Sequence, residues 1–181
     1  KDPRHVPTLS SLGRLYYAAG RWNDLLDIYG QELRLTSGKG RRVALLQKMA
    51  EISRDRLGSD EDALRYHREA IKVDAAHAPS LQELARQLRE RGDWEELVDV
   101  LELQLRNSGA ARIRARAAFL LGQVYEEHLD DRTKAVASYE TAISADASYR
   151  PAIDALARVR AEEHDWTHLL ADLEREVKLT E

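Results

Sequence analysis

Apolar positions along this chain follow a helical spacing that is interrupted at regular intervals. In residues 79–105 a stripe of leucine and alanine falls at i, i+3, i+4 and i+7, stops at Gly92 and resumes from Trp94. This spacing places the apolar side chains on one face of each of two helices, and Gly92 suits the left-handed end of the first helix. The segment therefore predicts a helical hairpin, and the chain shows no strand pattern.

The hairpin recurs at a fixed interval, which we call one period. A tryptophan and an arginine mark three copies, at Trp22, Trp94 and Trp166 and at Arg14, Arg86 and Arg158, and the interval between copies is 72 residues in both series. A fixed period of this kind is typical of stacked units that share a continuous core. The chain is therefore expected to be an all-α solenoid, without one central pocket.

Ten antiparallel helices follow from the stripes and their interruptions. The most loop-like stretch is Ser37-Gly38-Lys39-Gly40. The expected helices cover residues 6–19, 22–35, 41–57, 60–73, 78–91, 94–107, 111–129, 132–145, 150–163 and 166–179.

Composition narrows the classes of function. The 181 residues include no cysteine, which excludes thiol catalysis, disulfides and cysteine-ligated zinc. A net charge of −4 lacks the basic excess of a duplex-binding protein, so no nucleic-acid partner is expected. No apolar run approaches the ~20 residues of a membrane span, so no membrane partner is expected either. The compartment stays unknown, with the cytoplasm slightly favoured.

Several short motifs resemble the tetratricopeptide repeat. Leu121-Gly122-Gln123-Val124-Tyr125 followed by Ala135-Val136-Ala137-Ser138-Tyr139 resembles the hairpin pattern of that family, and Gly92-Asp93-Trp94 resembles its turn. The resemblance implies a right-handed superhelix in a single domain over residues 1–181. Its five units, two to each period, would cover approximately 2–38, 39–73, 74–110, 111–145 and 146–181. Helical hairpins of the HEAT or armadillo kind are the alternative fold.

The two ends of the chain carry a further expectation. Asp2-Pro3 resembles the junction between two repeats, and no polar capping helix follows Leu179. We therefore expect the chain to be part of a longer array, and end-to-end self-association of the chain is a hypothesis.

No catalytic or cofactor motif is present. The sequence lacks a glycine-rich phosphate loop, a nucleophile elbow and an HExxH motif, so we expect neither an enzyme nor a cofactor. The nearest approach to a metal cluster is Glu162-Glu163-His164-Asp165 with His168, which we interpret as exposed polar residues. His67 is interpreted as a core residue and His77 as a packing or capping residue. The tryptophans are interpreted as core residues near the turns.

The resemblance implies a binding face on the first helix of each hairpin. In this family that face lines a concave groove, where partner proteins bind as extended peptides or helices. The groove positions carried over to this chain that we select as partner-binding candidates are Arg14, Tyr17, Arg54, Gln82, Arg86, Arg89, Phe119, Gln123 and Arg158.

The recurring arginines suggest what kind of partner would bind. Guanidinium groups bind carboxylates in pairs of hydrogen bonds, which favours an acidic segment. The alternative is that Arg86 and Arg158 brace their own helices through Glu90 and Glu162, four residues later. The paired Lys and Asn of chaperone-binding repeats are not matched.

The sequence thus predicts a non-catalytic scaffold or adaptor that binds another protein. The rival prediction is a structural spacer or oligomerisation arm of a larger protein.

Overall fold

A computed structural model describes residues 6–162 and residue 170 of the chain, with side chains described from Thr8 onward. The tenth predicted helix, 166–179, lies outside the described residues apart from Leu170. Within the described part the helices are α1 (Val6–Ala18), α2 (Trp22–Leu35), α3 (Lys39–Leu57), α4 (Asp60–Val73), α5 (Ala78–Arg91), α6 (Trp94–Asn107), α7 (Ala111–Glu127), α8 (Arg132–Ala145) and α9 (Arg150–Glu162).

The start of α3 differs from the prediction. The helix begins at Lys39, two residues earlier than expected, so Lys39 and Gly40 are helical and not part of the loop. Gly38 is extended at the N-cap, and its carbonyl accepts the N–H of Arg42 at 3.0 Å. Lys39 Nζ also reaches Asp74 Oδ1 at 3.0 Å, which ties the first turn of α3 to the end of α4.

The end of α7 also differs, because its last turn is closed by a left-handed residue. Asp130 has φ 50°, and the N–H of Asp131 bonds back to the carbonyl of Tyr125 at 2.9 Å. Gly58, one period earlier, has φ 65° at the end of α3. This closure ends α7 at Glu127, two residues before the predicted end at residue 129.

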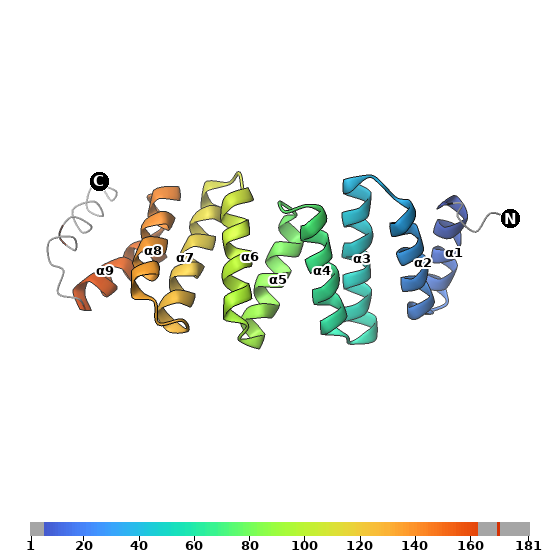
Figure 1. Cartoon of the computed structure of the whole chain (residues 1–181), viewed down its shortest axis with the longest axis horizontal. Helices are drawn as coiled ribbons and strands as arrows, with labels where there is room; N and C mark the ends of the chain where they lie inside the picture. Colours follow the sequence, from blue (N-terminus) through green and yellow to red (C-terminus); the bar gives the residue numbers. More distant parts are fainter. Residues whose placement is uncertain (1–5, 163–169, 171–181) are drawn as a thin grey trace. The chain divides into compact units, whose positions relative to one another are not determined.

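The chain divides into two compact units, Lys1–Gln87 and Leu88–Glu181, with the boundary inside α5. In the first unit α1 packs on α2, α2 on α3 and α3 on α4. In the second unit α6 packs on α7, α7 on α8 and α8 on α9. Figure 1 shows that these neighbours follow chain order, as in an all-α solenoid. The single domain of five repeats remains a prediction.

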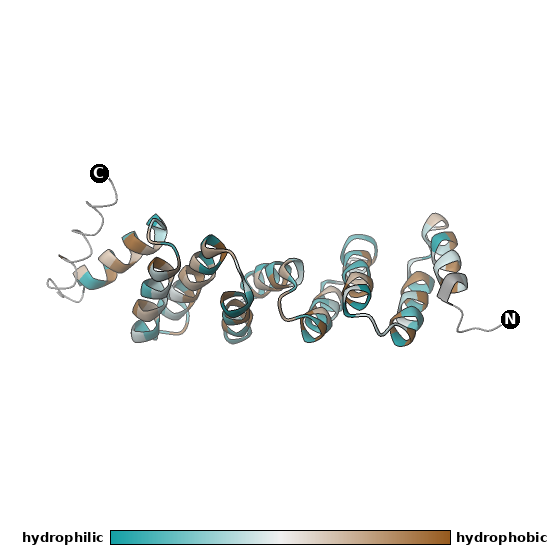
Figure 2. Ribbon diagram, turned by 90° about the horizontal axis from the view of Figure 1, so that it is seen from above, coloured by the Kyte–Doolittle hydropathy of each residue, from teal (hydrophilic) through white to brown (hydrophobic). Residues whose placement is uncertain are grey.

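Each unit has a core in which small and large residues alternate across the helix interfaces. Figure 2 shows that the helices have a brown, apolar side and a teal, polar side. In the second unit Ala135, Ala142 and Ala152 are fully buried beside the ring of Tyr139. The alanines let α8 and α9 approach closely, and the tyrosine fills the remaining space.

Candidate functional site

The candidate binding face is formed by the first helices of the hairpins, and ion pairs link these helices within each unit. In the first unit Arg54 Nη1 on α3 donates to Glu83 Oε1 on α5 at 2.6 Å. In the second unit Arg158 on α9 donates from Nη1 and Nη2 to the two carboxylate oxygens of Glu126 on α7, at 2.7 and 2.9 Å. The candidate residues Arg54 and Arg158 therefore lie on faces shared by consecutive first helices.

Glu83 is the centre of the network in the first unit. Its Oε1 accepts hydrogen bonds from Arg86 Nη2 at 2.6 Å, Gln87 Nε2 at 2.8 Å and Arg54. These bonds, that of Arg86 foremost, lower the pKa of Glu83 from 4.5 to about 2. The positive charges of Arg54 and Arg86 are thus partly neutralised within the protein.

Glu126 has the same role in the second unit. It accepts from both Arg158 and the hydroxyl of Tyr139, the latter at 2.7 Å, and the hydrogen bond of Arg158 lowers the pKa of Glu126. Burial, with the Glu126 contact second, raises the pKa of Tyr139. Arg158 also reaches Glu162 at 3.3 Å, so it does brace its own helix as the alternative interpretation expected.

Arg14 and Tyr17 lie beside a hollow in the first unit. The hollow has a volume of about 320 Å³ and is formed by α1, α2 and α3. Arg14 and Tyr17 are exposed, whereas Tyr29 is half-buried. The residues that line the hollow are Gly13, Arg14, Tyr17, Tyr29, Lys48, Glu51 and Ile52.

Five of the seven lining residues were not among the candidates: Gly13, Tyr29, Lys48, Glu51 and Ile52. Tyr29 belongs to the apolar stripe of α2, and Lys48 lies on α3. The sequence offered no signal for Lys48, because its position beside Arg14 depends on how the helices of the first unit pack.

The other candidates are distributed between the two units. Gln82 is exposed on α5 in the first unit, and Arg89 is exposed on the part of α5 that belongs to the second unit. Gln123 is half-buried on α7. Phe119, a candidate on α7, is half-buried, with its ring centroid 5.8 Å from those of Tyr139 and Tyr149, so it offers less exposed aromatic surface than a groove position would.

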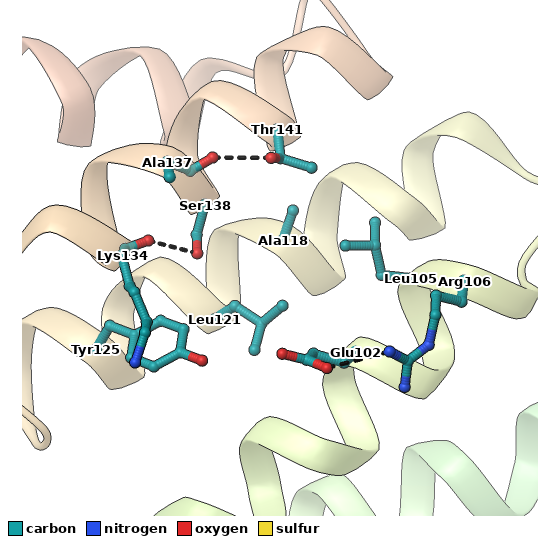
Figure 3. A pocket seen from close by; sticks show the side chains of 10 residues that line it. All are labelled: Glu102, Leu105, Arg106, Ala118, Leu121, Tyr125, Lys134, Ala137, Ser138 and Thr141. Carbon is teal, nitrogen blue, oxygen red and sulfur yellow. Dashed lines mark hydrogen bonds and ion pairs between the residues drawn. The ribbon is translucent and has the colours of Figure 1, made fainter. Parts of the chain in front are cut away.

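A second hollow lies among α6, α7 and α8 of the second unit (Figure 3). Its polar side chains interact within the protein. The Ser138 hydroxyl donates to the Lys134 carbonyl at 2.7 Å, Lys134 Nζ lies 5.2 Å from the centre of the Tyr125 ring, and Arg106 pairs with Glu102 at 3.2 Å. Because these polar groups already have partners within the protein, this hollow is a weaker candidate for ligand binding than one whose charged groups are unpaired.

The described tryptophans lie at the start of the second helices, as predicted, but each is half-buried under a flat side chain. The Arg56 guanidinium lies 5.1 Å from the ring centroid of Trp22, and the His128 ring stacks on Trp94 at 3.6 Å and 3°. Arg56 and His128 are one period apart, so the stack belongs to the repeat. Trp166 lies outside the described residues.

The two interpreted histidines both contact Ser80. His67 is 5% exposed with Nδ1 at 3.2 Å from Ser80 Oγ, and burial lowers its pKa. His77 precedes α5, and its Nδ1 accepts the N–H of Ser80 at 3.4 Å. The core and capping interpretations are consistent with these contacts.

Most of the acidic and histidine cluster at 162–168 lies outside the described residues. Among the residues that are described, no group of three or more histidine and acidic side chains is placed to hold a metal ion. Within the same residues, none of the helices combines the length and the apolar character that crossing a membrane would require.

Comparison with known protein families finds a match to two segments of the chain. A family model described as tetratricopeptide repeat matches residues 8–43 and 80–109. The starts of the two matches are separated by one period of the sequence. A comparison with curated proteins finds no match.

Solved structures of MamA have a similar fold. One crystal structure of MamA is 17% identical and has a TM-score of 0.57, with 96% of this chain and 90% of that chain covered. A second is 19% identical with a TM-score of 0.56, covering 93% and 96%. MamA from Desulfovibrio magneticus RS-1 is 18% identical with a TM-score of 0.50, covering 97% and 93%. At these identities the likeness concerns the fold alone.

Proposed function

We propose that this chain is a non-catalytic scaffold that binds a peptide or helix of another protein along its first helices, because two of its segments match the tetratricopeptide repeat. The repeats and the fold support a protein-interaction scaffold in general. The position of the binding face on the first helices is our own proposal. The binding residues would come from the nine candidates, and each unit would contribute those that lie on its own first helices.

The observation that carries this proposal is the construction of the first-helix face. Ion pairs between consecutive first helices, through Glu83 in one unit and Glu126 in the other, hold the face in place without a ligand. Exposed polar side chains such as Gln82 and Asp154 lie on the same helices. A preformed face loses little conformational entropy when a partner binds, which favours affinity.

The rival function, a spacer or oligomerisation arm, also has a supporting observation. Leu15 on α1 is 66% exposed, whereas the residues one and two periods later, Gln87 and Val159, are 4% and 0% exposed. In the second unit Val159 belongs to the core formed by α8 and α9. The exposed face of α1 would therefore accept a further helix of the α8 type.

An affinity capture from a lysate of the source cell discriminates the two proposals. One variant makes the first-helix face more acidic through Gln82→Glu and Arg89→Glu, and the matched control makes second helices more acidic through Lys72→Glu and Ser144→Glu. All four positions are exposed, and both variants change the net charge by the same amount. A partner retained by the wild type and the control, but lost by the first-helix variant, supports the scaffold. A partner retained by all three proteins contradicts it.

A further inference from the structure

The recurring arginine differs in its surroundings from copy to copy. Arg86 and Arg158 both pair with glutamates, Glu83 and Glu126. Arg14 donates instead to a neutral hydroxyl, Ser11 Oγ, at 3.3 Å. Ser11 lies one period before Glu83, so Arg14 lacks the neighbouring carboxylate that neutralises Arg86.

Lys48 is the second cation at this place. It is exposed on α3, and among the described residues it has no ion pair or hydrogen bond. It lines the same hollow as Arg14, and a neighbouring hollow shares both residues together with Tyr29. Arg14 and Lys48 therefore border one continuous depression formed by α1, α2 and α3.

The other charges of this depression are largely accounted for. The buried carboxylate of Glu32 pairs with Arg41, so these two cancel. Glu51 is exposed and accepts a hydrogen bond from Gln47 Nε2 at 3.0 Å. Two cations against this single remaining carboxylate leave the depression with an excess of positive charge.

Aromatic and apolar surface adjoins the two cations. The Tyr17 side chain is 54% exposed and touches the edge of Trp22, with ring centroids 5.4 Å apart. Ile52 and Gly13 line the hollow, and burial raises the pKa of Tyr29, so its hydroxyl stays neutral. An apolar side chain can contact Tyr17 and Ile52 while adjacent carboxylates reach the cations.

We propose that the depression bordered by Arg14, Lys48 and Tyr17 is the anchoring site for an extended acidic segment of a partner protein. The segment has aspartate or glutamate side chains beside one apolar or aromatic residue. This proposal rests on the proposed function and assigns its strongest charged contacts to the first unit. Arg54, Arg86 and Arg158 contribute less, because a ligand carboxylate would compete there with Glu83 or Glu126.

Selection of short random peptides on the complete chain tests the proposal. Enriched peptides are synthesised as C-terminal amides, and their binding is measured by fluorescence anisotropy. We expect acidic residues next to an apolar residue, and an affinity that falls as salt rises. Replacing both cations, in Arg14→Gln with Lys48→Gln, is expected to weaken binding about tenfold. Both residues are exposed, so the variant should keep its circular dichroism and melting temperature.

A matched variant controls for the loss of charge alone. Arg34→Gln with Lys72→Gln removes two exposed cations from second helices of the same unit, and binding is expected to change less than about twofold. Tyr17→Phe should retain affinity and Tyr17→Ala should lose it. Equal losses in both charge variants, peptides without acidic enrichment, or no enriched peptide would each overturn the proposal.

The outcome is separable from that of the proposed function. Peptides that depend on Gln82 and Asp154 but not on Arg14 and Lys48 would overturn the acidic anchoring site. They would leave binding along the first helices intact.

Discussion

Replacing Gly122 by alanine places a methyl group against the buried ring of Tyr139. The new Cβ would lie 2.5 Å from Cδ1 and 2.8 Å from Cζ of Tyr139, and closer still to Cε1. The ring has little room to retreat, because it is fully buried among alanines of α8 and α9 and its hydroxyl is held by Glu126. The substitution therefore forces α7 and α8 apart or tilts the ring.

Two effects of opposite sign set the magnitude. Overpacking of a close-packed core typically costs about 1–3 kcal/mol. Alanine in place of glycine inside a helix recovers roughly 0.5–1 kcal/mol. We expect Gly122→Ala to lower the free energy of opening of the α7–α8 hairpin by about 1–2 kcal/mol.

The repeat itself supplies the compensating change. One period earlier the corresponding positions are Ala50 and His67, a larger helix residue with a smaller ring. Tyr139→His alone should destabilise the hairpin, since it removes ring volume and the hydrogen bond to Glu126. Combined with Gly122→Ala, it should cost less than the sum of the two single changes, by about 1 kcal/mol or more.

Native-state hydrogen exchange of the α7 and α8 amides measures these energies locally, which matters because repeat arrays need not unfold in one step. The amides of α3 and α4, in the other unit, serve as the internal control. A cost of Gly122→Ala below about 0.5 kcal/mol, or a cycle that is additive within that margin, would refute the packing argument.

Three further predictions concern individual residues. Asp130 and Gly58 both have left-handed backbones, so Asp130→Gly should stabilise the end of α7 by about 0.5–1 kcal/mol and Gly58→Ala should destabilise the end of α3 by a similar amount. Denaturant midpoints that shift in the same direction for both variants would contradict this. The pKa of Glu83 is about 2 in place of 4.5, so its contribution is present above pH 4.5 and is lost as the pH falls toward 2; acid melts of Glu83→Gln should be flatter over that range, and parallel curves would be contrary evidence. His128→Ala should cost about 0.5–1 kcal/mol and change the emission of Trp94, whereas an unaltered spectrum would argue against the stack.

The helices were predictable because their signals are local. A stripe of apolar residues with helical spacing and a glycine such as Gly92, with φ 76°, mark each hairpin within a few residues. The end of α7 was missed because Asp130 adopts the left-handed conformation that Gly58 adopts one period earlier. Alignment of the two positions was the available signal.

The charge pattern of the candidate face was only partly predictable from spacing along a helix. Arg86 pairs with Glu83, three residues earlier on the same helix, whereas Arg54 reaches that glutamate from 29 residues away. Only the tertiary fold of the first unit brings Arg54 to Glu83. The isolation of Lys48 likewise depends on which neighbours the fold provides.

Site-specific photocrosslinking measures directly whether a partner contacts the first helices, which is the contact that the proposed function requires. A photoreactive amino acid would be introduced at Gln82 and at Asp154, and at the second-helix positions Lys72 and Ser144 for comparison; all four are exposed. We predict that partner protein from the source-cell lysate crosslinks to Gln82 and Asp154 and not to Lys72 and Ser144. Crosslinks confined to Lys72 and Ser144 would contradict it.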